Sequence, residues 1–277
     1  MMNRGVLYII IASFFFSIIN LLVKYLDQIP AIEIVFFRSV VSLLITGWAL
    51  YRQKIIPWNQ HTPLLVGRGL SGAIALTLYF TVIQNMPLAT AVTILYLAPI
   101  FTIIIAILLL KEYPNKWQWP FLIIGFIGTG LVKNTDPRVD FKYFFMAITA
   151  AIFAALAYNF IRMLKGKADH NLVIFYFPLI TIPFCLPFMI PVWKTPNLIN
   201  FGLLIAIGVF TQVAQVFMTK AYMLEKASKI SHYNYLTTFW AFISGIVFFD
   251  EHLNTLSIIG LFVIFIGIYF TSYFSSK

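Results

Sequence analysis

Residues 88–110, LATAVTILYLAPIFTIIIAILLL, run for 23 positions without a charged side chain. A helix that crosses the hydrocarbon core of a bilayer needs about 20 apolar residues. The stretch is bounded by Pro87 on one side and by Lys111 and Glu112 on the other. It therefore predicts a transmembrane helix that ends at these polar and helix-breaking residues.

Similar apolar runs continue on both sides of this stretch. In the first half they predict helices at 5–26, 31–51, 63–84, 88–110 and 117–134. After the polar segment 133–140 they predict helices at 141–163, 171–193, 198–222, 228–249 and 254–275. The expected fold class is an all-α membrane protein with ten transmembrane helices.

Composition supports this class. Hydrophobic residues make up 61% of the chain and charged residues 10%, whereas a soluble domain has about 25% charged residues. The net charge of +10 is spread over single basic residues between apolar runs, so it forms no basic face for nucleic acid. The lone Cys185 excludes an intramolecular disulfide and a multi-cysteine metal site. We expect neither a metal nor a cofactor.

Basic residues predict the orientation, because cytoplasmic loops retain lysine and arginine. With the N-terminus inside, the cytoplasmic side carries twelve: Arg4, Arg52, Lys54, Lys111, Lys116, Arg162, Lys165, Lys167, Lys220, Lys226, Lys229 and Lys277. The outer side carries five: Lys24, Lys133, Arg138, Lys142 and Lys194. We expect a multi-pass protein of the cell membrane, in a bacterium the inner membrane, with both termini in the cytoplasm.

The two halves also resemble each other. A shift of 139 positions places YLAPIF at 96–101 over YLTTFW at 235–240, Lys111-Glu112 over Asp250-Glu251, and Gly128 over Gly267. We predict one five-helix repeat in 1–135 and a second in 136–277. Because each has an odd number of helices, the second is inverted relative to the first, as in many secondary transporters.

The chain resembles the EamA-type branch of the drug/metabolite transporter superfamily over nearly its whole length. The segments that carry the resemblance are PAIEIVFFR at 30–38, PLATA at 87–91, Ala98-Pro99 and LKE at 110–112, with FDE at 249–251 in the second half. Thr238 departs from the family pattern, which has proline there. The resemblance implies ten helices, a central cavity between the halves, and substrates such as amino acids, other metabolites or drug-like molecules.

Two arginines lie inside predicted helices, where burying a charge costs about 2.5–3.5 kcal/mol. Arg38 either is tied to Glu33 or to helix-end carbonyls, or binds a substrate carboxylate or phosphate through its planar fork. Arg68 either pairs with Glu112 or extends to the interface, or contacts an inner gate. Arg68 and Glu112 are therefore gating candidates.

Polar and aromatic residues inside the predicted helices outline a substrate cavity. They are Asn20, Tyr79, Tyr96, Tyr158, Asn159, Gln212, Gln215, Tyr235 and Trp240. Each could instead join neighbouring helices by hydrogen bonds. Tyr96 and Tyr235 occupy equivalent places in the two predicted repeats, where they could face each other.

Coupling to protons has one candidate. All nine acidic residues fall in loops or near helix ends, and His232 is the histidine within a predicted helix. Its imidazole either carries a proton that controls an inner gate or is a neutral hydrogen-bonded group at the membrane interface.

These features favour a secondary transporter that moves a small organic metabolite by alternating access. No G-x-x-x-x-G-K-[ST] signature for nucleotide binding occurs. The alternatives are a channel-like facilitator, for which no selectivity-filter repeat is present, and an intramembrane enzyme, for which no His-Glu-x-x-His motif or pair of deep aspartates is present. The expected partners are a small-molecule substrate and the lipid bilayer; the sequence leaves the oligomeric state open.

Overall fold

A computed structural model gives the fold of the chain. It describes residues 4–58, 60–95, 97–113, 116, 119–120, 123–124, 127, 140–226, 230, 233, 236–250, 255, 259–260, 262–263, 266 and 270. Within these residues the secondary structure is helical, without strands. The predicted all-α class is confirmed for this part of the chain.

The helix bounds follow the predicted ones closely. The helices are α1 Arg4–Tyr25, α2 Ala31–Gln53, α3 Thr62–Asn85, α4 Leu88–Leu95, α5 Ala98–Leu110, α7 Phe141–Met163, α8 His170–Met189 with the 3-10 turn η1 Ile190–Val192, α9 Leu198–Leu224 and α11 Leu236–Phe249. Among the described residues, seven stretches are long and apolar enough to cross a membrane, and Phe239–Phe249 is a shorter apolar helix. The protein is a multi-pass membrane protein. The predicted helices at 117–134 and 254–275 lie largely outside the described residues.

One predicted helix is divided. The predicted stretch 88–110 consists of α4, which ends at Leu95, and α5, which begins at Ala98, and Thr90–Leu110 together are long and apolar enough for one membrane span. Pro99 lies at the start of α5 and has no backbone N–H to donate to a preceding turn. A proline is favourable in the first turn of a helix, so α5 begins here and α4 stops before it.

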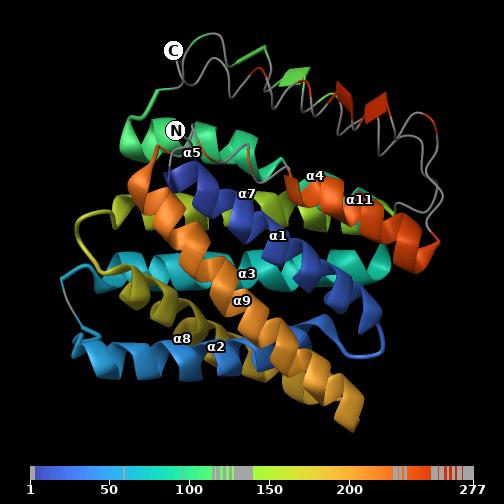
Figure 1. Cartoon of the computed structure of the whole chain (residues 1–277), viewed down its shortest axis with the longest axis horizontal. Helices are drawn as coiled ribbons and strands as arrows, with labels where there is room; N and C mark the ends of the chain where they lie inside the picture. The colour runs from blue at the N-terminus through green and yellow to red at the C-terminus, as the bar shows by residue number, and fades with distance from the viewer. Residues whose placement is uncertain are drawn as a thin grey trace.

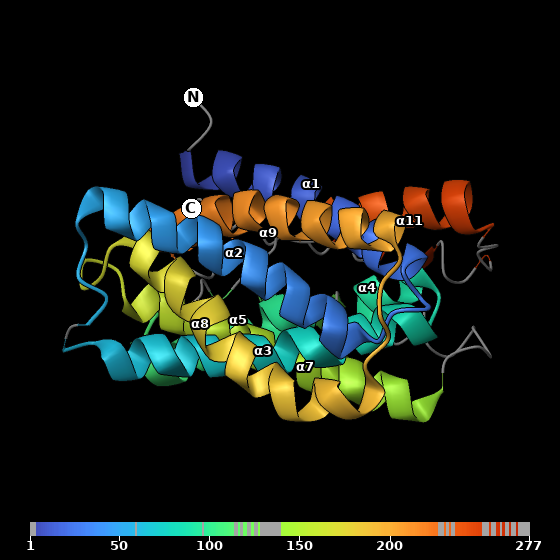
Figure 2. The same cartoon turned by 90° about the horizontal axis from the view of Figure 1, so that it is seen from below.

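The helices form one bundle in which elements of the two halves alternate (Figures 1 and 2). Helix α3 packs against α7 and α8, and α9 packs against α1 and α2. Helix α2 also packs against α8. These pairings match the predicted repeat: if α1, α2 and α3 are equivalent to α7, α8 and α9, the α3–α7 contact corresponds to α9–α1, the α3–α8 contact to α9–α2, and the α2–α8 contact to itself.

Two glycines allow helices of the two halves to approach closely. A Cβ at Gly69 of α3 would lie 2.9 Å from Cβ of Ile180 in α8, and one at Gly208 of α9 would lie 2.5 Å from Cβ of Val41 in α2. Gly69 and Gly208 are 139 positions apart, as are Val41 and Ile180. Small residues thus allow close approach at corresponding places in the bundle.

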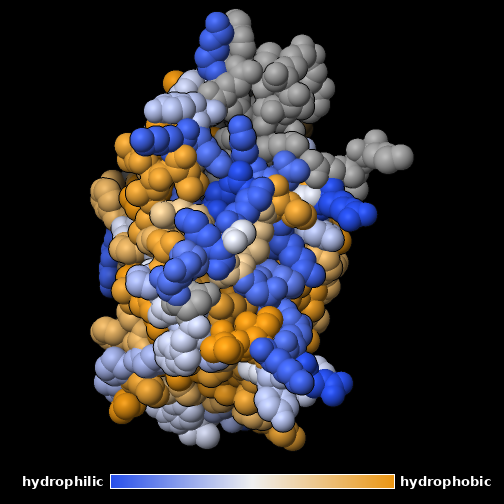
Figure 3. Space-filling model, turned by 90° about the vertical axis from the view of Figure 1, so that its left-hand side faces the viewer, coloured by the Kyte–Doolittle hydropathy of each residue, from blue (hydrophilic) through white to orange (hydrophobic). Residues whose placement is uncertain are grey.

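The surface is apolar around the bundle and more polar at one of its ends. Exposed apolar side chains include Leu44, Leu108, Phe145, Leu198 and Val247. Figure 3 looks onto the end where α2 ends and α3 begins, and many hydrophilic residues gather there. Exposed basic residues at this end are Arg52, Lys54, Lys165 and Lys167. An apolar belt between polar ends is the surface that a bilayer requires.

Candidate functional site

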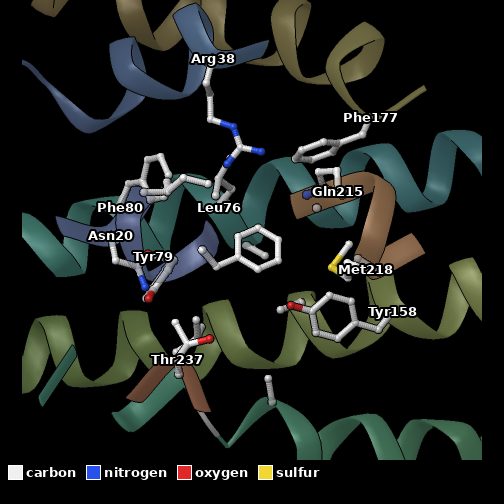
Figure 4. Close-up of a pocket in the computed structure, with 18 of the residues that line it drawn as sticks. Asn20, Arg38, Leu76, Tyr79, Phe80, Tyr158, Phe177, Gln215, Met218 and Thr237 are labelled. Atoms are coloured by element: carbon white, nitrogen blue, oxygen red, sulfur yellow. The ribbon is translucent and has the colours of Figure 1, made fainter. Parts of the chain in front are cut away.

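A cavity of about 120 Å³ lies between the helices of the two halves (Figure 4). Since a single water needs roughly 10–15 Å³, the cavity can hold a bound group of several atoms. The described residues that line it are Phe16, Ile19, Asn20, Arg38, Arg68, Gly72, Ala75, Leu76, Tyr79, Phe80, Leu95, Ala98, Pro99, Ala154, Ala157, Tyr158, Phe177, Gln215, Met218 and Thr237.

Arg38 extends from α2 into this cavity (Figure 4) and is 2% exposed. Its guanidinium carbon lies 5.7 Å from the ring centroid of Phe80 and 5.4 Å from that of Phe177. Within the described part of the chain it has no hydrogen bond or ion pair, and its buried Nε lacks a partner. The interpretation that it is tied to Glu33 is wrong, since Oε2 of Glu33 accepts the backbone N–H of Lys194 at 3.0 Å.

Arg68 enters the cavity from α3 and is also 2% exposed. Its guanidinium carbon lies 4.2 Å from the ring centroid of Phe177, and its Nη2 donates to Oε1 of Gln215 at 2.9 Å. Gly72, one turn further along α3, leaves room for both side chains. A Cβ there would lie 2.5 Å from Nη1 of Arg68 and 2.7 Å from Cε2 of Phe177.

Glu112 does not pair with Arg68, so that interpretation is wrong. Its Oε1 lies 2.8 Å from Nη2 of Arg162 and accepts from Nε of the same arginine at 2.9 Å. Arg162 is in the last turn of α7 and Glu112 follows the end of α5. The pair joins two helix ends, and Glu112 is not among the residues that line the cavity.

The remaining polar groups of the cavity are neutral. Asn20 and Tyr79 share a side-chain hydrogen bond. Tyr158 stacks on Tyr222 with 4.9 Å between ring centroids, and the Thr237 hydroxyl donates to the backbone carbonyl of Ser13 at 3.3 Å. Among the described lining residues there is no aspartate or glutamate, so the cavity carries two positive charges without a negative one.

The cavity brings together six of the predicted site residues: Asn20, Arg38, Arg68, Tyr79, Tyr158 and Gln215. Three others lie elsewhere. Gln212 accepts from Ser42 at 2.7 Å, and Asn159 donates to the carbonyl of Thr102 at 3.0 Å. Trp240 is 38% exposed and packs edge-on against Phe14. Tyr96, Tyr235 and His232 lie outside the described residues.

Sequence reasoning missed Phe177, which contacts both arginines, and also Met218 and Thr237. Apolar side chains inside a membrane helix carry no sign of whether they face lipid or a cavity. The shift of 139 positions is the signal that could have found them. It relates Arg38 to Phe177, Tyr79 to Met218 and Ala98 to Thr237.

No group of three histidine, cysteine, aspartate or glutamate residues that could hold a metal occurs among the described residues. The chemistry available in the cavity is therefore that of guanidinium, amide, phenol and hydroxyl groups against apolar and aromatic walls. Such a site can bind and release a ligand by hydrogen bonds and charge.

The sequence profile of the EamA-like transporter family matches the chain twice, over residues 3–133 and 141–273. The chain belongs to the EamA-like transporter family. Two curated relatives are similar along most of their length. The pseudopaline exporter of Pseudomonas aeruginosa is 32% identical over 263 residues, which cover 94% of this chain and 93% of the exporter. Solute carrier family 35 member G1 of Mus musculus is 31% identical and covers 89% of this chain and 72% of its own length.

A solved crystal structure shares the fold of this EamA-like transporter. The two chains align with a TM-score of 0.76 at 15% identity, over 98% of this chain and 97% of the other. The family match and the relatives named as transporters assign the protein to membrane transport of small molecules.

Proposed function

We propose that this EamA-like transporter carries a small organic metabolite across the membrane by alternating access. Residues 1–135 and 136–277 act as two inverted repeats, and the substrate binds in the cavity between them. The cavity itself carries the proposal, because helices of both halves line it.

The lining supports the repeat. Five pairs of lining residues lie 139 positions apart: Ile19 and Tyr158, Arg38 and Phe177, Leu76 and Gln215, Tyr79 and Met218, and Ala98 and Thr237. A site on the axis that relates two repeats contacts equivalent positions of both. The double family match and the glycine contacts of α3 and α9 support the same arrangement.

The contacts between the halves are suited to relative movement. At Gly69 and Gly208 no side chain projects from α3 toward α8 or from α9 toward α2, and small residues at helix contacts permit close approach and sliding. Helix α8 contains Pro178, Pro183 and Pro187, each of which removes one hydrogen bond from the helix. A helix with missing hydrogen bonds bends at lower cost, which favours opening of the cavity to one side at a time.

The basic end of the bundle is assigned to the cytoplasm. Arg52, Lys54, Lys165 and Lys167 are exposed there, and the positive-inside rule places such residues on the cytoplasmic side. This orientation puts both termini inside the cell.

Transport by purified protein in liposomes tests the function. Vesicles are screened with labelled amino acids, organic acids, nucleosides and amines, and saturation and counterflow are measured. A carrier saturates and exchanges labelled for unlabelled substrate, whereas a channel-like facilitator gives no counterflow. Ala154→Trp fills the cavity and should abolish transport, while Ile152→Trp on the exposed face of α7 should not. Unsaturable flux, or equal activity of both variants, would contradict the proposal.

A further inference from the structure

We propose that the cargo is a small organic anion whose carboxylate or phosphate group binds between Arg38 and Arg68. This inference rests on the proposed function, because it takes the cavity as the transport site. It adds the charge class of the substrate and the two groups that bind it.

The first observation is the missing counter-charge. Arg38 and Arg68 are each 2% exposed, and buried charges in proteins are ordinarily paired with opposite charges. Among the described residues their contacts are neutral: the rings of Phe80 and Phe177, and the amide of Gln215. Aromatic rings offset part of the cost of a buried cation but do not neutralise it. An anionic ligand would.

The second observation is the position of the two cations. Both guanidinium groups contact the one ring of Phe177, at 5.4 Å for Arg38 and 4.2 Å for Arg68. They are close enough to repel each other. An anion between them relieves this repulsion and contacts both, so one carboxylate or phosphate neutralises the site better than two separate ligands.

The third observation is unused hydrogen-bonding capacity. Nε of Arg38 and Nε of Arg68 are buried without partners, and the single hydrogen bond found for the pair is that from Arg68 to Gln215 within the described part of the chain. The planar fork of arginine donates two parallel hydrogen bonds to a carboxylate or phosphate. Two such forks at one place form a receptor for an oxyanion.

Two acidic residues that the sequence suggested as partners of the arginines make other contacts. Glu33 accepts from the backbone of Lys194, and Glu112 pairs with Arg162. Neither lines the cavity. Within the described residues no acidic side chain neutralises the two arginines, and the proposed substrate anion would do so.

The rest of the cavity defines the body of the ligand. The apolar part of the lining includes Phe16, Ile19, Leu76 and Met218. Asn20 and Tyr79 supply neutral polar groups apart from Arg38 (Figure 4). The ligand is thus an anion with an apolar portion, rather than an inorganic ion.

The test compares compounds that share a skeleton and differ in charge. Phenylpropyl and hexyl skeletons are each prepared as the carboxylate, the amide, the amine and the phosphate monoester. Thermal stabilisation of the purified protein gives binding, and counterflow of the labelled compounds in proteoliposomes gives transport. The carboxylate or the phosphate should raise the thermal midpoint of the protein and show counterflow. The matched amide and amine should do neither. Comparison of the two anions identifies which oxyanion the site prefers.

Arginine variants locate the anion. Arg38→Gln and Arg68→Gln should each weaken anion binding by about tenfold or more, because each removes a charged double hydrogen bond. Arg52→Gln removes an exposed cation from the same helix as Arg38 and should leave binding unchanged. If a glutamine variant does not fold, Arg38→Lys or Arg68→Lys is used instead. Lysine keeps the charge but lacks the planar fork, so the affinity for the anion should still fall.

The outcomes separate the two proposals. Counterflow of the amides or amines alone overturns the anion inference and leaves the transporter intact. Anion binding with unchanged affinity in both glutamine variants also overturns it. Anion binding without counterflow supports the anion site and contradicts alternating access. If no compound of any charge class binds or shows counterflow, both proposals are contradicted.

Discussion

Arg38 contacts Phe177, with 5.4 Å between the guanidinium carbon and the ring centroid, and the two residues lie 139 positions apart in the sequence. In the proposed repeat they are equivalent residues. Two equivalent residues of a two-fold arrangement touch each other only close to its axis. The contact therefore marks the axis of the proposed repeat, and one side of it has a cation where the other has an aromatic ring.

Replacement of Arg38 by methionine should stabilise the substrate-free protein. Apolar residues in place of buried charges are often stabilising by about 1–4 kcal/mol, because the desolvation cost is removed. At about 2–4 °C per kcal/mol, the thermal midpoint should rise by several degrees. Thermal unfolding in detergent measures it, with Arg52→Met as the exposed control. If the thermal midpoint falls in Arg38→Met but not in Arg52→Met, Arg38 stabilises the substrate-free fold and the prediction is wrong.

Alanine at Gly208 should destabilise the bundle. Its Cβ would lie 2.5 Å from Cβ of Val41, so α9 and α2 must move apart, at a cost of about 1–3 kcal/mol. Gly202 lies on the same helix with nothing within 4 Å of an added Cβ. Gly202→Ala should be neutral or stabilising by up to about 1 kcal/mol, since alanine favours helix. Thermal midpoints compare the two variants, and equal effects would refute the close contact.

The ion pair of Glu112 and Arg162 should show strong coupling. Both side chains are largely buried, so removal of one leaves the other charge without its partner. Glu112→Gln and Arg162→Gln should each lower the thermal midpoint, and the double variant should lose less than the sum. A double-mutant cycle should give about 1–3 kcal/mol of coupling. Additive effects would mean that the pair contributes little to joining α5 and α7.

Cysteine labelling tests the orientation. In a Cys185→Ser background, Thr195→Cys should react with an impermeant thiol reagent added outside the cell, and Lys167→Cys should react only after the membrane is opened. Thr195 and Lys167 are both exposed, and they lie at opposite ends of the bundle. The reverse pattern would place the basic end outside and refute the cytoplasmic termini.

Helix positions could be predicted because charges and prolines mark the membrane boundaries. The break before Pro99 was missed, since a proline within an apolar run fits either a kink or a new helix. In the site, polar side chains such as Asn20 and Tyr79 point inward because lipid cannot satisfy them. Gln212 and Asn159 avoid lipid equally well by bonding Ser42 and Thr102, and only their partners reveal the difference.

The partners of Arg38, Arg68 and Glu112 could not be predicted from position along the chain. Glu112 lies near the membrane level expected for Arg68, but the side chain that reaches it belongs to Arg162 of α7. Such choices depend on how helices from different halves rotate against one another. The rotation of one helix against another cannot be predicted from a sequence that is apolar on almost every helix face.

The two unpaired arginines also have an electrical consequence. A charge that crosses a membrane potential of 100 mV changes free energy by about 2.3 kcal/mol. Both cations line the same cavity, so in the proposed alternating-access cycle the empty carrier would move positive charge whenever α2 and α3 shift across the field. A bound dianion cancels that charge, whereas a monoanion leaves half of it. The voltage across the membrane should then act on the return of the empty carrier far more than on exchange of a dianion, and it gives the cycle a preferred direction.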